Sequence, residues 1–441
     1  MSFALRLYAA AASVAYPFIE GWLRRRHAEG FDERRAIYAG DKLEKLKKGS
    51  TLWLHAVSVG EVQATSPVVD EIAWLGRDVP ILLSTVTETG ARSARLLMGG
   101  KIAAHVYAPW DVPKITKKAC RSVMPAVYAT AETEVWPNLL TEMKRMGIPT
   151  LLINARISDR TMARAGLAKG LLKEAYGLFD AILARSDEDR SRLIELGAAK
   201  SRITVTGDTK ADALMRRKAI AERGLPRLRE KILPSGGICF VAGSTHEGEE
   251  ETVLDAFSRL RGGNGPINDA KLVVAPRHPE RALAVRGKAR EICPAEKTEL
   301  YSDLNGQNDA SIIVVDAIGV LFDLYGLATA AFIGGSLVPK GGQNILEPAI
   351  WGTPVLHGPH MEDFALPASE LNASGASFTV KTSEEMESLW RRAAKGLLPS
   401  PDYTGGYFAA NLGAAARTAE AILSYAGVSA RIQRPSSERR A

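Results

Sequence analysis

The sequence predicts an α/β protein built from two similar halves, each a parallel sheet with helices on both faces, with a cleft between the halves. Short apolar runs alternate with helical segments from about 51 to 210, and the same rhythm recurs from 238 to 380. The length of 441 residues also exceeds what one ordinary hydrophobic core accommodates. These observations together predict a doubly wound, two-domain architecture.

Most of the apolar runs are nearly continuous, which is typical of strands buried on both faces of a parallel sheet. The expected strands are 52–57, 79–84, 103–107, 126–129, 150–153, 181–184 and 203–205 in the first half, and 238–242, 272–275, 312–315, 331–333, 354–356 and 376–380 in the second. The expected domain bounds are an N-terminal segment (1–30), a first domain (31–215), a linker (216–236), a second domain (237–425) and a polar tail (426–441). The last helix, over about 407–425, could pack back across the join.

The N-terminal segment has the character of a helix that lies on a membrane surface. Its apolar stretch, 7–19, is shorter than the roughly 20 residues that a spanning helix needs. Trp22 and the basic cluster Arg24–His27 follow, which suits the surface of an anionic cytoplasmic leaflet. A cleaved signal peptide and an ordinary surface helix are the alternatives.

Composition narrows the classes of partner. A net charge of +7 permits phosphorylated small molecules or an acidic membrane surface. The chain lacks a stripe of interleaved basic and aromatic residues, so no nucleic-acid partner is expected. Its three cysteines are far apart, which favours small core residues over disulfides or a zinc site.

The stretch 51–62 carries the main catalytic candidate of the first half. An apolar strand ends in a turn through Gly60, and Glu61 opens the next helix. Ligands of doubly wound folds lie beyond the carboxyl ends of strands, where this carboxylate would stand. Glu61 is therefore a candidate general base, and the alternative is an acid that merely complements the helix dipole.

Other polar groups follow strands in the same half. The hydroxyl-rich turn 84–90 could bind an anion or a sugar, or could simply cap a helix. Glu132 and Glu134 stand beside Trp136 at another strand end, where tuned carboxylates could act as acid, base or charge stabiliser, or decorate a helix start. Lys210 could direct a cation into the cleft, although a solvated lysine is the default.

The second half contains candidate phosphate-binding segments. Arg277 is fixed between prolines after a strand, which suits bidentate phosphate contacts. The glycine-rich stretch 334–348 is expected to offer free backbone amides and a helix start to an anion, with Glu347 accepting from ribose hydroxyls. A glycine-rich turn without a ligand is the alternative. The His246–Glu250 spacing suits a metal pair, but no third ligand is evident, so no metal site is expected.

Seven motifs resemble the 3-deoxy-D-manno-octulosonic acid (Kdo) transferases of lipid A biosynthesis, in the same order along the chain. They are HAVSVGE (55–61), ETEVWPN (132–138), INARIS (153–158), VTGDTKAD (205–212), STHEGEE (244–250), PRHPER (276–281) and GGSLVPKGGQNILEPA (334–349). The resemblance implies a GT-B fold of two Rossmann-like domains. It also implies an acceptor site in the first domain, CMP-Kdo in the second, and attachment to the cytoplasmic face of the inner membrane of a Gram-negative cell.

The resemblance also implies roles for individual residues. Glu61 matches the proton acceptor, and Glu132 and Lys210 match positions that stabilise the transition state. The segments matching the CMP-binding residues are Pro276–Arg277 (Pro276, Arg277), Ile318–Val320 (Ile318, Gly319, Val320) and Asn344–Glu347 (Asn344, Ile345, Leu346, Glu347). The Ile318–Val320 segment gave no signal of its own beyond a turn before a helix. Gln343 departs from the family pattern, where many relatives have histidine.

The implied reaction is inverting transfer of Kdo from CMP-Kdo to lipid IVA, with no cofactor and no metal. The alternatives are another GT-B nucleotide-sugar transferase or epimerase, and a catalytically silent, membrane-attached nucleotide-binding protein. The number of Kdo units transferred does not follow from the sequence.

Overall fold

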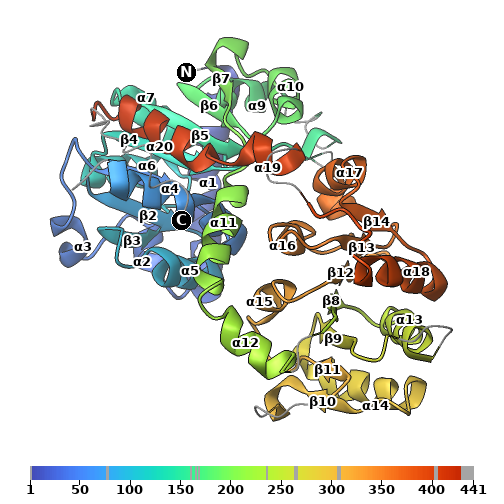
Figure 1. The fold of residues 1–441 in the computed structure, drawn as a ribbon. Coiled ribbons are helices and arrows are strands. Elements are labelled where there is room, and N and C mark those ends of the chain that lie inside the picture. Colours follow the sequence, from blue (N-terminus) through green and yellow to red (C-terminus); the bar gives the residue numbers. More distant parts are fainter. Residues whose placement is uncertain are drawn as a thin grey trace. The chain divides into compact units, whose positions relative to one another are not determined.

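The computed structural model describes residues 2–75, 79–158, 161–163, 166, 169–234, 237–262, 267–304, 309–401 and 406–428. The chain forms two compact units (Figure 1): unit 1 is Met1–Ala213 with Asn411–Ala441, and unit 2 is Leu214–Ala410. The expected polar tail, 426–441, lies outside the described residues from 429 onward.

Unit 1 contains a sheet of seven strands in the order β3-β2-β1-β4-β5-β6-β7, all parallel. The strands are β1 (Leu52–His55), β2 (Ile81–Thr85), β3 (Ala104–Tyr107), β4 (Val127–Ala131), β5 (Thr150–Ala155), β6 (Ala181–Ala184) and β7 (Ile203–Val205). The strand order reverses between β1 and β4. In doubly wound sheets a ligand crevice lies beyond the strand ends at such a switch point.

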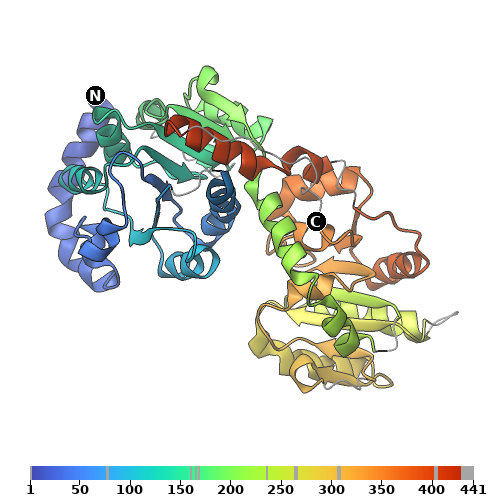
Figure 2. The same ribbon diagram turned by 60° about the vertical axis from the view of Figure 1, so that its left-hand side comes forward.

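Helices cover both faces of this sheet (Figures 1 and 2). They are α1 (Phe3–Arg26), α2 (Phe31–Arg34), α3 (Gly40–Glu44), α4 (Val59–Leu75), α5 (Glu88–Met98), α6 (Pro113–Val123), α7 (Pro137–Arg145), α9 (Lys169–Tyr176), α10 (Asp187–Glu195), α11 (Thr209–Ala221, which continues into unit 2) and α20 (Ala414–Tyr425), with a short 3-10 helix at Lys200–Arg202. Trp53 and Tyr128 belong to the core that includes α6 and α7, whereas Leu52 and Leu54 belong to the core that includes α4 and α20. The alternation of side chains along each strand thus supplies two cores.

Unit 2 repeats this architecture with a second sheet of seven parallel strands, in the order β10-β11-β9-β8-β12-β13-β14. The strands are β8 (Cys239–Thr245), β9 (Lys271–Pro276), β10 (Thr298–Leu300), β11 (Ile312–Val314), β12 (Ala330–Ile333), β13 (Val355–His357) and β14 (Ser377–Thr379). The helices are α12 (Leu225–Ile232), α13 (Glu250–Gly262), α14 (Ala282–Ile292), α15 (Leu321–Tyr325), α16 (Leu346–Ala349), α17 (Ala365–Ala373), α18 (Ser383–Ala394) and α19 (Gly406–Asn411, whose last residue belongs to unit 1), with 3-10 helices at Pro279–Arg281, Tyr301–Asp303 and Glu362–Phe364. The switch point here lies between β8 and β12.

The predicted α/β class and every predicted strand are confirmed, with shifts of a few residues at strand ends. β10 is an additional edge strand. The three cysteines are buried, as expected of core residues.

The units differ from the domain bounds expected from the sequence. The stretch expected as a linker contains the last part of α11 and all of α12, and the division between the units falls within α11. Helix α20 lies inside the expected bounds of the second domain but belongs to unit 1 (Figure 2), as the expected packing of the last helix back across the join allows. The reason is its apolar face: Ala415, Ala419, Ile422 and Leu423 are buried in the same core as β1 and α4.

The N-terminal helix α1 has two unlike faces. On one face Leu5 and Leu23 are buried within unit 1, and the Tyr8 hydroxyl donates to Asp111 Oδ2 at 3.0 Å. Its exposed apolar residues are Phe3, Leu7, Val14, Phe18, Ile19 and Trp22. Among the described residues, no helix combines the length and the apolar character needed to cross a bilayer.

Candidate active site

Glu61 lies at the switch point of unit 1, in the first turn of α4 directly after β1. Its side chain is only 7% exposed. The backbone N–H of Val57 donates to Glu61 Oε2 at 2.7 Å, and the Ser58 hydroxyl donates to Oε1 at 3.3 Å. The turn that ends β1 therefore fixes the carboxyl group.

Burial raises the pKa of Glu61 to about 7, opposed by the hydrogen bond from Val57. The charges of Glu134 and Glu132 raise that pKa further, whereas the hydrogen bond from Ser58 lowers it. A solvated acid that only complemented the helix dipole would have a lowered pKa. Glu61 is instead a carboxyl group that can exchange a proton near neutral pH.

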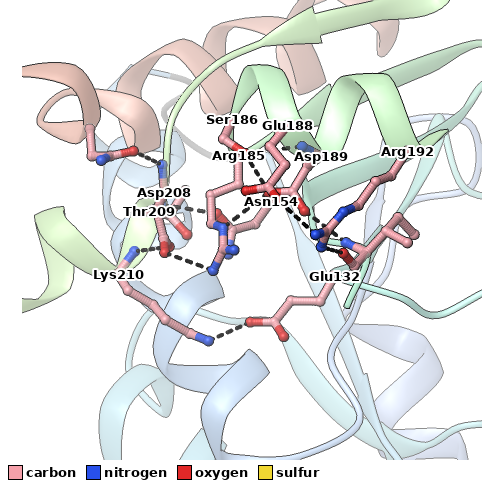
Figure 3. A network of polar contacts seen from close by, with 12 residues as sticks. Glu132, Asn154, Arg185, Ser186, Glu188, Asp189, Arg192, Asp208, Thr209 and Lys210 are labelled. Atoms are coloured by element: carbon pink, nitrogen blue, oxygen red, sulfur yellow. Dashed lines mark hydrogen bonds and ion pairs between the residues drawn. The ribbon is translucent and has the colours of Figure 1, made fainter. Parts of the chain in front are cut away.

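Glu132 and Lys210 form an ion pair, with 2.6 Å between Lys210 Nζ and Glu132 Oε1 (Figure 3). Glu132 follows β4, on the other side of the switch point from Glu61. Its φ of 57° is in the left-handed region, which non-glycine residues rarely adopt and which costs free energy. A hydrogen bond from its N–H to the Ile153 carbonyl, at 2.9 Å, helps to hold this conformation.

A polar network fixes the start of α11, which carries Lys210 (Figure 3). Asn154 Oδ1 accepts from the Thr209 N–H at 3.0 Å, and Asp208 Oδ1 accepts from the Lys210 N–H at 2.9 Å. Arg185 Nη1 lies 3.5 Å from Asp208 Oδ2. The backbone of Lys210 is thus held while its ammonium group reaches Glu132.

Two further titratable groups near Glu61, Glu134 and His55, have shifted pKa values. Burial raises the pKa of Glu134 to about 7; a hydrogen bond with Trp136 lowers it and the charge of Glu132 raises it. Burial lowers the pKa of His55 to about 4, and its Nδ1 lies 2.9 Å from the Ser84 hydroxyl. His55 is therefore neutral at pH 7, and Glu61 and Glu134 are the acids beside the switch point that titrate near neutrality.

The hydroxyl-rich turn 84–90 acts as a helix cap. The Thr87 hydroxyl accepts from the Gly90 N–H at 3.0 Å at the start of α5, and it donates to the Val57 carbonyl at 3.2 Å. Ser84 lies within β2, where its hydroxyl accepts from Trp53 Nε1 at 2.8 Å. Of the two interpretations offered for the turn 84–90, the hydrogen bonds of Thr87 therefore agree with the helix cap.

The glycine-rich stretch of unit 2 corrects a prediction. The amides of Gly335, Ser336 and Leu337, expected to be free for an anion, all donate to the carboxylate of Glu249 at 2.7–3.0 Å. The predicted helix start near Asn344 is also weaker than expected, because α16 has only four residues. Asn344 Oδ1 accepts from the Leu346 N–H at 3.2 Å, which caps this short helix.

The three segments predicted to bind CMP all follow strands of unit 2. Pro276–Arg277 ends β9, Ile318–Val320 lies between β11 and α15, and Asn344–Glu347 lies between β12 and the end of α16. Parallel strands bring these segments to one edge of the sheet. Arg277 and Ile318 are exposed there, and Gly319 has a φ of 92°.

Arg217 links one of these segments to α15 within unit 2. Its Nη1 lies 3.3 Å from Glu347 Oε1, and its guanidinium carbon lies 4.0 Å from the centre of the Phe322 ring in α15. Burial raises the pKa of Glu347, while Arg217 and then Asn344 oppose that shift. Glu347 is thus directed toward a cation of α11 in this structure.

The His246–Glu250 pair does not have the arrangement of a metal site. Glu250 Oε1 lies 2.7 Å from Arg281 Nη1, so an arginine already neutralises this carboxylate. The His246 backbone N–H donates to Glu249 Oε2 at 2.8 Å. These acids hold protein groups together.

Comparisons with known proteins place the chain among glycosyltransferases. Residues 29–213 match the family described as 3-deoxy-D-manno-octulosonic-acid transferase (kdotransferase). The 3-deoxy-D-manno-octulosonic acid transferase of Bordetella pertussis is 32% identical over 366 residues, which cover 81% of this chain and 83% of that protein. This chain belongs to the Kdo transferase family. The transferase of Aquifex aeolicus is 30% identical over 356 residues, covering 81% of this chain and 89% of that protein.

The fold of this Kdo transferase also resembles enzymes of the GT-B type. The structure of UDP-GlcNAc 2-epimerase from Neisseria meningitidis, bound to UDP-GlcNAc, superposes with a TM-score of 0.57. The match covers 85% of this chain and 99% of that chain at 12% sequence identity. At that identity the likeness describes the fold alone: two parallel-sheet α/β domains.

In this Kdo transferase, Glu132 and Lys210 are in contact and Glu61 lies within reach of the charge of Glu132. Sequence reasoning included Glu134 among the candidate carboxylates but missed the roles of Asn154, Arg217 and Glu249. Glu134 and Asn154 lie inside recognised motifs, whereas Arg217 lies in the expected linker. Glu249 directly follows a turn that ends at Gly248, which was the only signal near it, because its partners Gly335–Leu337 lie 86–88 residues further along the chain.

Proposed function

We propose that this protein transfers Kdo from CMP-Kdo to lipid IVA in lipopolysaccharide biosynthesis, with inversion at the anomeric carbon and Glu61 as the general base. The observation that carries the proposal is the buried carboxyl group of Glu61, with a pKa of about 7, at the switch point of unit 1. Family membership supports Kdo as the transferred group.

The proposed step is a single displacement. Glu61 takes the proton of an acceptor sugar hydroxyl, and the hydroxyl oxygen forms a bond to the anomeric carbon of Kdo. The bond from that carbon to the CMP phosphate oxygen breaks, and CMP leaves with the electron pair. Because the oxygen attacks the face opposite CMP, the configuration inverts.

The remaining residues have supporting roles in this proposal. Lys210, fixed by its ion pair with Glu132, places a cation beside the reacting groups and offsets charge that develops in the transition state. Arg277 and the segments Ile318–Val320 and Asn344–Glu347 of unit 2 bind the CMP moiety. The mechanism uses no cofactor and no metal ion.

Mass spectrometry of lipid IVA incubated with CMP-Kdo and the purified protein tests this function. The expected result is a mass gain of one or more Kdo units, which also counts the units transferred. The same reaction in EDTA is expected to proceed at an unchanged rate. No gain in mass would overturn the proposal, and loss of activity in EDTA would overturn the metal-free mechanism.

Donor competition separates this function from that of another GT-B nucleotide-sugar enzyme. CMP is expected to inhibit transfer, whereas UDP at equal concentration is not. A protein that binds UDP in preference to CMP would instead have the donor preference of the epimerases that its fold resembles.

Activity is expected to rise with pH through about 7. Burial raises the pKa of Glu61 to about 7, so the carboxylate that accepts the proton is the minor form below that pH and the major form above it. A plot of log kcat/KM against pH, from about 5.5 to 8.5, is expected to show a limb of slope one and then a plateau.

The neighbouring acid provides the control for this profile. Because the charge of Glu134 raises the pKa of Glu61, the Glu134→Gln variant is expected to move the limb to lower pH. A profile already flat at pH 5.5 in the native protein would contradict an active base with a raised pKa.

We propose that α1 attaches the protein to the cytoplasmic face of the inner membrane by lying in the membrane surface. Phe18 is 85% exposed and Trp22 is 51% exposed, on a helix whose Leu5 and Leu23 are buried against unit 1. The last turn carries Arg24, Arg25 and Arg26, which favour anionic lipid headgroups.

Replacing both Phe18 and Trp22 with serine is expected to weaken binding to anionic phosphatidylglycerol vesicles at least about tenfold. Full burial of one large apolar side chain contributes about 1.5–3 kcal/mol, and 1.4 kcal/mol corresponds to a factor of ten. Vesicle co-sedimentation measures the change. The Leu283→Ser variant is the control, because Leu283 is also exposed but lies in α14 of unit 2. Equal vesicle binding by the double variant and the native protein would contradict attachment through α1.

A further inference from the structure

Glu249 is a fully buried acid at the switch point of unit 2. Its exposed fraction is 0%, and it lies directly before α13, in the connection that follows β8. Oε1 accepts from the N–H groups of Ser336 and Leu337 at 3.0 and 2.9 Å, and Oε2 accepts from those of Gly335 and His246 at 2.7 and 2.8 Å. Four backbone amides thus converge on one carboxylate.

This arrangement is that of an anion-binding turn whose anion is part of the protein. Successive backbone N–H groups after a strand form a concavity that commonly holds a phosphate. No ion pair to Glu249 occurs among the residues that the structure describes, so these amides are the donors that compensate its carboxylate. A ligand phosphate would have to displace a buried carboxylate to reach them.

The turn that Glu249 holds is built for close contact with β8. A Cβ atom at Gly334 would lie 2.2 Å from the Ser244 carbonyl oxygen, so only glycine fits there. Gly335 has a φ of 68°, and a Cβ atom added to it would lie 3.3 Å from the His246 ring. The turn after β12 is therefore pressed against the end of β8, and Glu249 joins the two.

We propose that Glu249 is a positioning residue of the donor site. Its carboxylate holds the turn Gly335–Leu337 in place by accepting hydrogen bonds from the backbone N–H groups of the turn. Because these N–H groups are already used, the negative groups of the donor are bound by side chains. This inference rests on the proposed function of unit 2 as the CMP-Kdo-binding domain. It assigns the glycine-rich turn a scaffolding role in place of direct phosphate binding.

The side chains next to the turn are suited to that task. Arg277 is exposed, and its backbone N–H is fixed by the Thr245 carbonyl at 2.9 Å. Burial lowers the pKa of His246, the charge of Glu249 opposes this, and the charges of His278, Lys340 and Arg277 lower it further. The positive charges of Arg277 and Lys340 therefore act close to His246, beside the turn whose backbone N–H groups donate to Glu249.

The Glu249→Gln variant tests the proposal. Glutamine keeps the size of the side chain but directs an NH₂ group at amides that need an acceptor. The KM for CMP-Kdo and the Kd for CMP are expected to rise at least about tenfold, while kcat at saturating donor and the KM for the lipid acceptor change less than about twofold. Steady-state kinetics and calorimetric titration with CMP measure these values.

Glu250 provides a matched control on the adjacent position. It is also 0% exposed, but its partner is Arg281, at 2.7 Å, and not the turn. The Glu250→Gln variant is expected to lower the melting temperature without raising the KM for CMP-Kdo. Equal effects of the two variants on donor KM, or native CMP affinity in Glu249→Gln, would overturn the proposal.

A second variant keeps the test decisive if Glu249→Gln does not fold. Gly335→Ala leaves Glu249 in place but disturbs the same turn, because alanine disfavours the φ of 68° and crowds His246. It is expected to give the same selective rise in donor KM and CMP Kd, and unchanged CMP affinity would count against the role of the turn. CMP titration is independent of catalysis, so native protein that binds CMP but transfers no Kdo would refute the proposed function alone.

Discussion

Replacing Glu61 with glutamine is expected to lower kcat for Kdo transfer by about 10²–10⁴-fold, the usual contribution of a positioned general base. Glutamine preserves the size of the side chain and can still accept from the Val57 N–H, but it cannot take a proton from the acceptor. Because the donor site is proposed to lie in unit 2, the Kd for CMP is expected to stay within about twofold of the native value. Single-turnover kinetics and calorimetry measure the two quantities separately.

The control for this variant is another buried acid of unit 1. Glu142 is 8% exposed, lies in α7 and pairs with Arg145 at 2.9 Å. Glu142→Gln is expected to retain native kcat. If Glu61→Gln transferred Kdo at the native rate, another group would have to be the base, and Glu134 would be the next to test.

Replacing Lys210 with methionine is expected to lower kcat about 100-fold, because a fixed positive charge beside the reacting groups is lost. Removing Glu132 as well is expected to cost less than the product of the two single losses, since the pair is joined at 2.6 Å and acts as a unit. A double-mutant cycle on kcat, with Lys210→Met and Glu132→Gln, measures this coupling.

Unit 1 contains a second lysine pair of the same length that serves as the control. Lys144 Nζ lies 2.6 Å from Asp180 Oδ1, on a more exposed part of the surface. Lys144→Met is expected to leave kcat unchanged, because exposed ion pairs contribute little and this one lies outside the proposed site. Independent, multiplicative losses in the Lys210 and Glu132 variants would show that their contact has no part in catalysis.

The strands could be predicted because each one is a short, nearly continuous run of apolar residues, a pattern that is not expected of a surface segment. The missed strand β10 shows the limit of that signal: Thr298–Leu300 has only three residues, includes Glu299, and lies at the sheet edge. An edge strand needs only one neighbour, so its sequence carries little pattern. The sequence allowed the last helix to pack back across the join, but it did not identify the core that α20 completes, because an amphipathic helix does not specify its partner.

Chemistry at the site was predictable where a residue's role depends on its immediate neighbours. Glu61 could be proposed as a base because a strand and a glycine turn precede it. The left-handed φ of Glu132 goes with a hydrogen bond to Ile153 of the next strand, and the contact of Lys210 with Glu132 joins two segments that are distant in the sequence. Glu249 appeared to be an ordinary acid near a helix start, because its partners Gly335–Leu337 lie 86–88 residues further along the chain.

The packing of α20 against α4, β4 and β5 has a consequence for how the protein forms in the cell. During synthesis the ribosome releases all of unit 2, Leu214–Ala410, before it reaches Ala414–Tyr425. Unit 2 can therefore fold while it is still attached to the ribosome, whereas the part of unit 1 that α20 covers stays uncovered until this helix emerges. The domain that begins the chain is the last to be completed, and the nascent protein exposes the surface that α20 covers to chaperones until Ala414–Tyr425 has been made.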